Sequence, residues 1–177
     1  MQSTTFEDFR DVLSAAAGSA CRCSRSELAA TITQLIDHET IWSTTDLEDE
    51  WPGLAAEFST RGISVRTDSS PENTRDQPWG LTTAQGAIAE SGSVVLQENE
   101  LNRRSVSLMT NKLIVLCPLD QLLPSLDDAA KLLRNIASDG KSYATLVSGP
   151  SRTADIERQL TIGVQGPGEL HVVFVED

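Results

Sequence analysis

The segment 147–157 joins a predicted strand to a predicted helix through a Gly-Pro turn, and its polar residues are typical of anion binding. A helix start exposes unpaired N–H groups, here beside the hydroxyls of Ser151 and Thr153 and the guanidinium of Arg152. Asp155 already complements the positive end of that helix and disfavours a strongly anionic ligand. A well-capped helix that binds nothing is the alternative, and the pattern leaves both open.

A second segment, 80–96, combines small residues with one carboxylate, Glu90. Its spacing predicts a short Ala-rich helix that Gly92 ends before a strand begins. A carboxylate in this position can act as a general base, a nucleophile or a ligand contact, and it can equally be an exposed helix residue. The sequence does not decide between these roles.

Two adjacent arginines, Arg103 and Arg104, follow Asn102 in a predicted polar loop. Such arginines either form an anion clamp or remain ordinary surface charges. Together with the two segments above, this loop completes the set of residues that we expect to border one cleft. The candidate ligand-binding residues are Glu90, Arg104, Gly149, Ser151, Arg152, Thr153 and Asp155.

The cysteines and histidines are too few for a metal or cluster site. Cys21, Cys23 and Cys117 include no Cys-x-x-Cys pair and no run spaced for an iron–sulfur cluster. The chain has two histidines, which gives zinc little support. The glycines of 163–168 do not follow the G-x-G-x-x-G spacing of dinucleotide sites. We therefore expect no metal, cluster or Rossmann-type cofactor on this chain.

The elements that would position these residues alternate between strands and helices after residue 78. Alternation of this kind predicts an α/β fold with a mostly parallel sheet flanked by helices. Ligands of such sheets bind beyond the carboxyl ends of the strands. The predicted strands are 93–97, 112–117, 143–147 and 170–175, and the predicted helices are 119–137 and 153–160.

The first third of the chain reads as helical. Apolar residues at helical spacing predict helices near 5–17, 24–36 and 47–58, and the alternation in 63–66 predicts one strand. The polar stretch 68–78 predicts a loop. We expect residues 1–67 to form an N-terminal helical segment that packs on an α/β core of residues 68–177, within one compact domain.

Composition limits the classes of partner. The chain has 177 residues, 39% of them hydrophobic, which suits one ordinary core. Its net charge of −12 repels phosphate backbones and anionic lipid headgroups. The first residues lack a secretory signal pattern, and no apolar run approaches the roughly 20 residues of a membrane span. We expect a cytoplasmic protein without nucleic-acid or membrane partners.

Read together, four segments of this sequence resemble the lactate-utilization (LUD) domain family, and more closely its small-subunit group, lactate utilization protein C. The match covers roughly the C-terminal half to two thirds of the chain. The segment that begins at Ser148 is the most distinctive. The four are Ala-Ile-Ala-Glu-Ser-Gly-Ser (87–93), Arg-Ser-Val-Ser-Leu (104–108), Ser-Gly-Pro-Ser-Arg-Thr-Ala-Asp-Ile-Glu (148–157) and Gly-Val-Gln-Gly-Pro (163–167).

This resemblance implies a fold similar to CoA transferases and sugar-phosphate isomerases. It also implies an accessory role in oxidising L-lactate to pyruvate, with a cysteine-rich subunit and an iron–sulfur subunit that carry the clusters. A different hypothesis is that the chain works alone and binds or transforms an acyl-CoA or a phosphorylated small molecule. Whether the chain is itself an enzyme stays open.

Two positions depart from the family pattern. Gln165 stands where the resemblance leads us to expect His, and Thr110 stands where we expect Pro. Glutamine forms hydrogen bonds but does not titrate near neutral pH. A general-acid or metal-binding role for the 163–167 loop is therefore in doubt.

Overall fold

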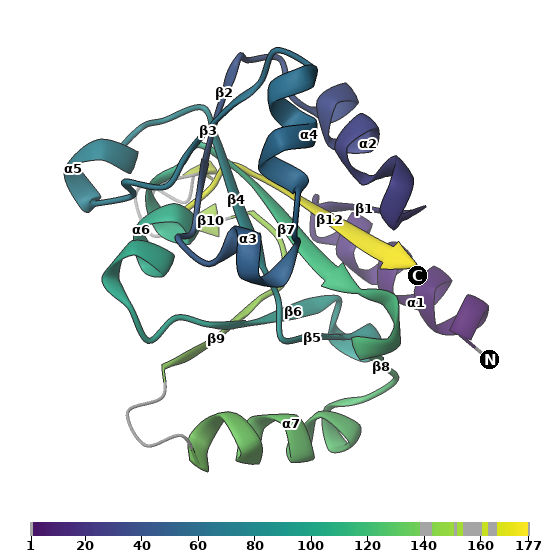
Figure 1. Cartoon of the computed structure of the whole chain (residues 1–177). Coiled ribbons are helices and arrows are strands. Elements are labelled where there is room, and N and C mark those ends of the chain that lie inside the picture. Colours follow the sequence, from purple (N-terminus) through teal and green to yellow (C-terminus); the bar gives the residue numbers. More distant parts are fainter. Residues whose placement is uncertain (1, 139–142, 151, 154–160, 163–165, 177) are drawn as a thin grey trace.

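Six parallel strands form the main sheet in this computed structural model, which describes residues 2–138, 143–150, 152–153, 161–162 and 166–176. They are β1 (Ser19–Ser24), β2 (Thr40–Ser43), β3 (Ser64–Arg66), β4 (Trp79–Thr83), β7 (Lys112–Pro118) and β12 (Glu169–Glu176). Their order is β1-β12-β7-β4-β2-β3, and every pairing between neighbours is parallel (Figure 1). The predicted mostly parallel α/β fold is confirmed.

The central strands are buried on both faces, because helices cover each side of a parallel sheet. Successive residues of β7 alternate between the two cores: Leu113 and Val115 belong to one, Ile114 and Leu116 to the other. The apolar run that predicts strand 112–117 therefore reflects burial on both sides.

Three helices cover one face of the main sheet: α2 (Leu28–Leu35), α3 (Leu47–Glu50) and α4 (Leu54–Thr60). The opposite face packs against α1 (Gln2–Ala15) and α6 (Leu101–Met109), with Phe6 and Phe9 of α1 in edge-to-face contact with Phe174 of β12. No helix in the described part of the chain is long and apolar enough to cross a bilayer.

A second sheet of four strands lies on the same face as α1 and α6. Its strands are β5 (Gly86–Ile88), β6 (Ser93–Gln97), β8 (Leu122–Leu123) and β9 (Ala144–Val147), in the order β8-β5-β6-β9. Helix α7 (Leu126–Ser138) packs on its outer side through a small apolar cluster that includes Ala129 and Ile136. Figure 1 shows this outermost layer of the molecule.

Short elements complete the description. They are α5 (Pro71–Thr74), the 3-10 turns η1 (Arg25–Glu27), η2 (Ala89–Ser91) and η3 (Leu119–Gln121), and the strand pair β10 (Arg152–Thr153) and β11 (Thr161–Ile162).

Residues 1–67 are not wholly helical, which corrects the prediction for this segment. The expected helices are present, and the strand predicted at 63–66 is β3. However, β1 and β2 also lie in this segment, and both belong to the main sheet. Strand β1 pairs with β12, which is far away in sequence, and its six residues, Ser-Ala-Cys-Arg-Cys-Ser, carry no local strand signal.

The predicted strands of the second half are confirmed as β6, β7, β9 and β12, whereas four other local predictions need correction. The helix predicted over 119–137 is α7, which begins at Leu126, and η3 and β8 occupy 119–123. The short helix predicted before Gly92 is the 3-10 turn η2, which Gly92 ends before β6 as predicted, but it is shorter than expected because residues 86–88 form a strand that pairs with β6 and β8. The two arginines of the expected loop lie on α6. Thr153 lies in β10 instead of starting a helix, and residues 154–160 lie outside the described residues.

Candidate functional site at the carboxyl edge of the main sheet

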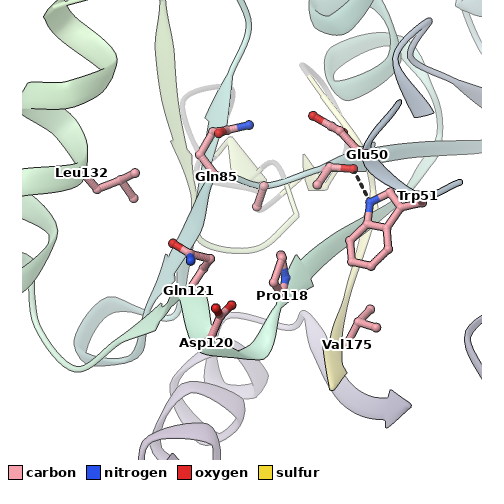
Figure 2. Close-up of a pocket in the computed structure, with 10 residues that line it drawn as sticks. Glu50, Trp51, Gln85, Pro118, Asp120, Gln121, Leu132 and Val175 are labelled. Atoms are coloured by element: carbon pink, nitrogen blue, oxygen red, sulfur yellow. Dashed lines mark hydrogen bonds between the residues drawn. The ribbon is translucent and has the colours of Figure 1, made fainter. Parts of the chain in front are cut away.

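A cavity of about 540 Å³ opens where β4, β7 and β12 end. This volume lies within the roughly 300–1,000 Å³ that is usual for small-molecule sites. Figure 2 shows Glu50 and Trp51 on one side of it and Leu132 on the other. The lining residues are Glu50, Trp51, Thr83, Ala84, Gln85, Pro118, Asp120, Gln121, Leu132 and Val175.

The topology explains why these residues meet. Parallel strands place their carboxyl ends at one edge, so the segments that leave β4 and β7 lie beside each other there. Thr83 is the last residue of β4, and Pro118 ends β7 before η3. The segment that follows β2 supplies α3, which ends at Glu50 directly before Trp51 and Pro52. The cavity therefore lies in the position that the parallel fold predicts for a ligand.

One hydrogen bond links two walls of the cavity. The indole N–H of Trp51 donates to the Thr83 hydroxyl across 2.8 Å, and both side chains are buried (Figure 2). This bond joins the residue after α3 to the end of β4 and holds the indole ring against the cavity. The ring gives the site an apolar surface beside a hydroxyl group.

Glu50 reaches the cavity from an ionic cluster of three side chains, which it forms with Asp46 and Arg103. The Arg103 guanidinium of α6 forms an ion pair with Asp46 and lies 3.1 Å from Oε1 of Glu50. All three side chains are largely buried, with exposed fractions of 15% for Arg103, 27% for Asp46 and 24% for Glu50. Two carboxylates thus share one guanidinium, which leaves this cluster with a formal charge of −1.

Burial shapes the acid–base properties of this cluster. It raises the pKa of Glu50, and the neighbouring Thr83 hydroxyl acts in the opposite direction. Burial lowers the pKa of Arg103. Oδ1 of Asp46 and Oε2 of Glu50 are buried and have no hydrogen-bond partner in the described part of the chain. These two oxygens are therefore enclosed by the protein itself and are not exposed in the cavity.

The polar lining favours hydrogen-bond donors over anions. Glu50 and Asp120 are acidic, Gln85 and Gln121 carry amides, and no Lys, Arg or His of the described residues lines the cavity. No group of three or more His, Cys, Asp or Glu in that part of the chain is arranged to hold a metal ion. The chemistry that these side chains can perform is hydrogen bonding and proton transfer through carboxylates.

Glu90, the first predicted site residue, lies outside this cavity. Its Oε2 accepts a hydrogen bond of 3.0 Å from the amide N–H of Leu126, at the start of α7. It also borders a separate hollow of about 380 Å³ with Asp8 and Asp11 of α1. The carboxylate thus holds α7 to the η2 turn, and a ligand-binding role for it stays a prediction.

Arg104 lies on α6, which follows β6, whereas Glu90 lies in the η2 turn before β6. Its guanidinium donates to the backbone carbonyl of Glu98 at 3.0 Å and lies 5.4 Å from the centre of the Tyr143 ring. Glu90 and Arg104 were predicted to border one cleft, but neither side chain lines the cavity. Both have partners within the fold.

Gly149 lies close to the Glu90 segment. The hydroxyls of Ser93 and Ser148 are 2.6 Å apart, which joins the start of β6 to the turn after β9. Gly149 has φ +125°, and a side chain there would lie 2.8 Å from the carbonyl oxygen of Ala16. The glycine is thus required for close packing against the end of α1.

The other predicted site residues lie at the margin of the described structure. Arg152 and Thr153 form β10, of which the backbone is described. Ser151, Asp155 and Gln165 lie outside the described residues. Their ligand-binding role stays a prediction.

The residues of the cavity were missed by sequence reasoning because the strands that position them were missed. Glu50 and Trp51 follow β2, and Thr83 ends β4; neither strand was predicted. The available signal was Glu50-Trp51-Pro52, a carboxylate and an aromatic ring before a helix-breaking proline. Recognising it requires the knowledge that a parallel strand ends nearby.

Thr110, one of the two departures, has a structural role. Its hydroxyl donates to the carbonyl of Val106 at 2.8 Å, at the end of α6. Its side chain also packs directly over Gly80, where an added Cβ would lie 2.4 Å from the hydroxyl oxygen. The threonine thus ends this helix against β4.

Comparisons with known proteins agree with the fold. A crystal structure of a DUF162 family protein from Deinococcus radiodurans has a TM-score of 0.76 and 20% identity, and it covers 99% of this chain and 98% of that chain. Lactate utilization protein C of Bacillus licheniformis is 31% identical over 134 residues, which are 74% of this chain and 55% of that protein.

Lactate utilization protein C 1 of Bacillus mycoides is 39% identical over 101 residues, which are 55% of this chain and 43% of that protein. The chain thus spans about half the length of the curated relatives it matches. The model of the LUD domain matches residues 6–175, nearly the whole chain. The resemblance read from the four sequence segments is confirmed: this chain belongs to the LUD domain family.

Proposed function

We propose that this chain takes part in lactate utilization, as a non-redox subunit of a system that oxidises L-lactate to pyruvate. The observation that carries this proposal is the LUD match over residues 6–175, together with relatives named lactate utilization protein C. The proposed partners are a cysteine-rich subunit and an iron–sulfur subunit, which would hold the clusters and handle the electrons.

The state of the cysteines supports this division of work. Cys21, Cys23 and Cys117 are free thiols, and Cys117 is fully buried. Burial raises the pKa of all three thiols above the ordinary value. Iron binds the thiolate form of cysteine, so thiols that resist deprotonation are poor cluster ligands. The proposal therefore assigns no cluster and no cofactor to this chain.

The cavity at the carboxyl edge gives the subunit a place where it can bind a compact molecule. It does not favour the alternative function, in which the chain binds an acyl-CoA or a phosphorylated compound. Phosphate groups need cationic or N–H-rich surroundings. The described lining instead presents Glu50 and Asp120, which repel anions.

Growth on L-lactate tests the metabolic role. Deleting the gene in its native host should abolish or slow growth on L-lactate, leave growth on pyruvate unchanged, and be reversed by the wild-type gene. Equal growth of the deleted and parent strains on L-lactate would refute the role. Growth on pyruvate serves as the control because that carbon source enters after the oxidation.

Co-purification tests the partners. The tagged chain should retain a cysteine-rich and an iron–sulfur protein when the three are expressed together, and the complex should show the visible absorbance of iron–sulfur clusters. The tagged chain purified alone should be colourless. A chain that elutes alone from the co-expressing cells would refute the assignment as a subunit.

A further inference from the structure

A serine, a histidine and a glutamate are linked at the amino edge of the main sheet, where β4, β7 and β12 begin (Figure 1). Ser19 begins β1 and lies directly beside His171 of β12, and Glu169 begins β12. The Ser19 hydroxyl is 2.7 Å from Nδ1 of His171, and Nε2 of the same ring is 3.4 Å from Oε2 of Glu169. The parallel pairing of β1 with β12 brings these groups together, although 152 positions separate Ser19 from His171 in the sequence.

The partners of the imidazole decide which of its nitrogens carries the proton. An ionised glutamate only accepts hydrogen bonds, so Nε2 carries the proton and donates to Glu169. Nδ1 then has a free lone pair, and the Ser19 hydroxyl donates to it. A hydroxyl that donates to an imidazole, which a carboxylate orients in turn, is the arrangement of a nucleophilic serine. His171 can therefore take the proton when the Ser19 oxygen attacks.

Neighbouring strands hold the imidazole and the carboxylate in place. The ring of Trp79, at the start of β4, lies 5.7 Å from the His171 ring. Trp79 is buried, and its indole N–H donates to Asp37 across 2.7 Å, which fixes that ring. Lys112 of β7 lies 3.4 Å from Oε1 of Glu169 and 4.8 Å from the centre of the Trp79 ring. The base and its carboxylate are thus positioned before any substrate arrives, as proton transfer to a fixed base requires.

Exposure and charge define the reagent that this arrangement suits. Ser19 is exposed, whereas the His171 side chain has an exposed fraction of 21%. A small molecule can therefore reach the serine oxygen from solvent. The three groups supply a nucleophile and a base, but none of them donates to the oxyanion that forms when a carbonyl is attacked. A carbonyl compound with a weakly basic leaving group reacts without that help, so the arrangement suits activated esters.

We propose that Ser19 is a reactive serine that accepts an acyl group from small activated esters, with His171 as its general base and Glu169 as the residue that orients the imidazole. The Ser19 oxygen forms a bond to the carbonyl carbon, and the bond from that carbon to the leaving oxygen breaks. The hydroxyl proton passes through His171 to the leaving oxygen, so the products are acyl-Ser19 and the free alcohol. This inference goes beyond the role in lactate utilization and does not depend on it, because it concerns one hydroxyl of the purified chain.

The probe is 4-nitrophenyl acetate, which transfers one acetyl group and releases a coloured alcohol. The purified chain is treated at about pH 7.5, and peptide mass spectrometry follows the acetylation of each residue. Ser19 should be acetylated at least about tenfold faster than Ser59, an exposed serine on α4. Hydroxylamine should then remove the acetyl group from Ser19, because an ester is cleaved where a lysine amide is not.

Three variants locate the reaction. Ser19→Ala should remove the fast acetylation from the peptide that contains position 19. His171→Gln should slow the acetylation of Ser19 by about a hundredfold, the lower end of what a general base contributes, because glutamine does not take up the proton. Glu169→Gln should slow it by a smaller factor, because the imidazole keeps its contact with Ser19. Glu72→Gln, an exposed carboxylate on α5, is the matched control and should react as the wild type does.

Two results would overturn the proposal. One is a Ser19 acetylation rate within about threefold of the Ser59 rate. The other is a Ser19 rate that His171→Gln leaves unchanged in a folded chain. If His171→Gln fails to fold, Glu169→Gln decides, and a rate equal to that of Glu72→Gln then overturns the proposal. The growth assay reports separately on lactate utilization, so the failure of either proposal is visible by itself.

Discussion

Replacing Arg103 by leucine tests whether its guanidinium holds the Glu50 side of the cavity together. Arg103 is the cation that contacts Asp46 and Glu50, and it also donates to the carbonyl of Gln97 at 3.4 Å. Leucine keeps part of the packing volume and removes the charge. The variant therefore leaves two largely buried carboxylates without a counter-charge.

The size of the effect follows from the burial of the cluster. Removing one partner of a fully buried ion pair costs about 3–5 kcal/mol. The exposed fractions of 15% for Arg103, 27% for Asp46 and 24% for Glu50 let solvent screen part of this loss. We expect the free energy of unfolding to fall by about 2–3 kcal/mol, which for a chain of this length lowers Tm by roughly 5–10 °C.

The loss should depend on pH in a defined direction. Burial raises the pKa of the Glu50 carboxyl in the folded state above its unfolded value of about 4.3, and the loss of the Arg103 charge raises it further. A group with a raised folded pKa destabilises the fold when it is ionised, and this penalty disappears as the pH falls below the unfolded pKa. The difference between wild type and Arg103→Leu should therefore shrink from about pH 7.5 to about pH 5.

Urea unfolding followed by tryptophan fluorescence measures this difference at both pH values. Arg104→Leu is the matched control on the same helix, because Arg104 contacts a backbone carbonyl and an aromatic ring and forms no ion pair in the described structure. Its loss of stability should be smaller and nearly independent of pH. An Arg103→Leu loss below about 0.5 kcal/mol, or one equal at both pH values, would refute the reasoning.

Three further predictions concern other parts of the fold. Gly92→Ala should lower the free energy of unfolding by about 1–3 kcal/mol in thermal unfolding, because φ is +58° and the new Cβ would lie 2.8 Å from the backbone nitrogen of Leu13. Gly168→Ala is the control: its new Cβ would lie 3.7 Å from the nearest atom, so stability should change little. Cys117 should resist iodoacetamide until the chain unfolds, as peptide mass spectrometry can measure, because burial raises the pKa of its thiol and hides it. Glu48→Ala should cost about 1 kcal/mol or less of unfolding free energy near neutral pH, because the Glu48 carboxylate accepts hydrogen bonds from two amides at the start of α4. These hydrogen bonds lower the pKa of Glu48, so its contribution to stability is lost as the pH falls through that pKa. Equal costs in neutral and acidic urea titrations would contradict this prediction.

The fold class was predictable because long-range burial leaves a local trace in the central strands. Strand β7 is buried on both faces, so its sequence is a continuous apolar run. Strand β6 begins directly after a glycine with positive φ, which marks the boundary in the sequence. The helices α1 and α2 have apolar residues at helical spacing.

The cavity was not predictable from the same signals. Strand β2 has only four residues, and β1 has no large apolar residue, so neither has the length or the alternation that identifies a strand. Their strand state comes from pairing with β4 and β12. Without β2 and β4, no reasoning from sequence places Glu50 beside Thr83.

The sequence by itself determined the family, the alternating α/β plan and the acidic character of the chain, since these depend on composition, local periodicity and ordered motifs. Only the tertiary structure decided which polar residues share a site. Glu90 and Arg104 lie in two of the four segments that carry the family resemblance, yet both form contacts within the fold. Glu50 lies in no motif, and it reaches the cavity because parallel strands end at one edge and α6 places Arg103 behind it. Such proximity depends on strand order, which local sequence does not encode.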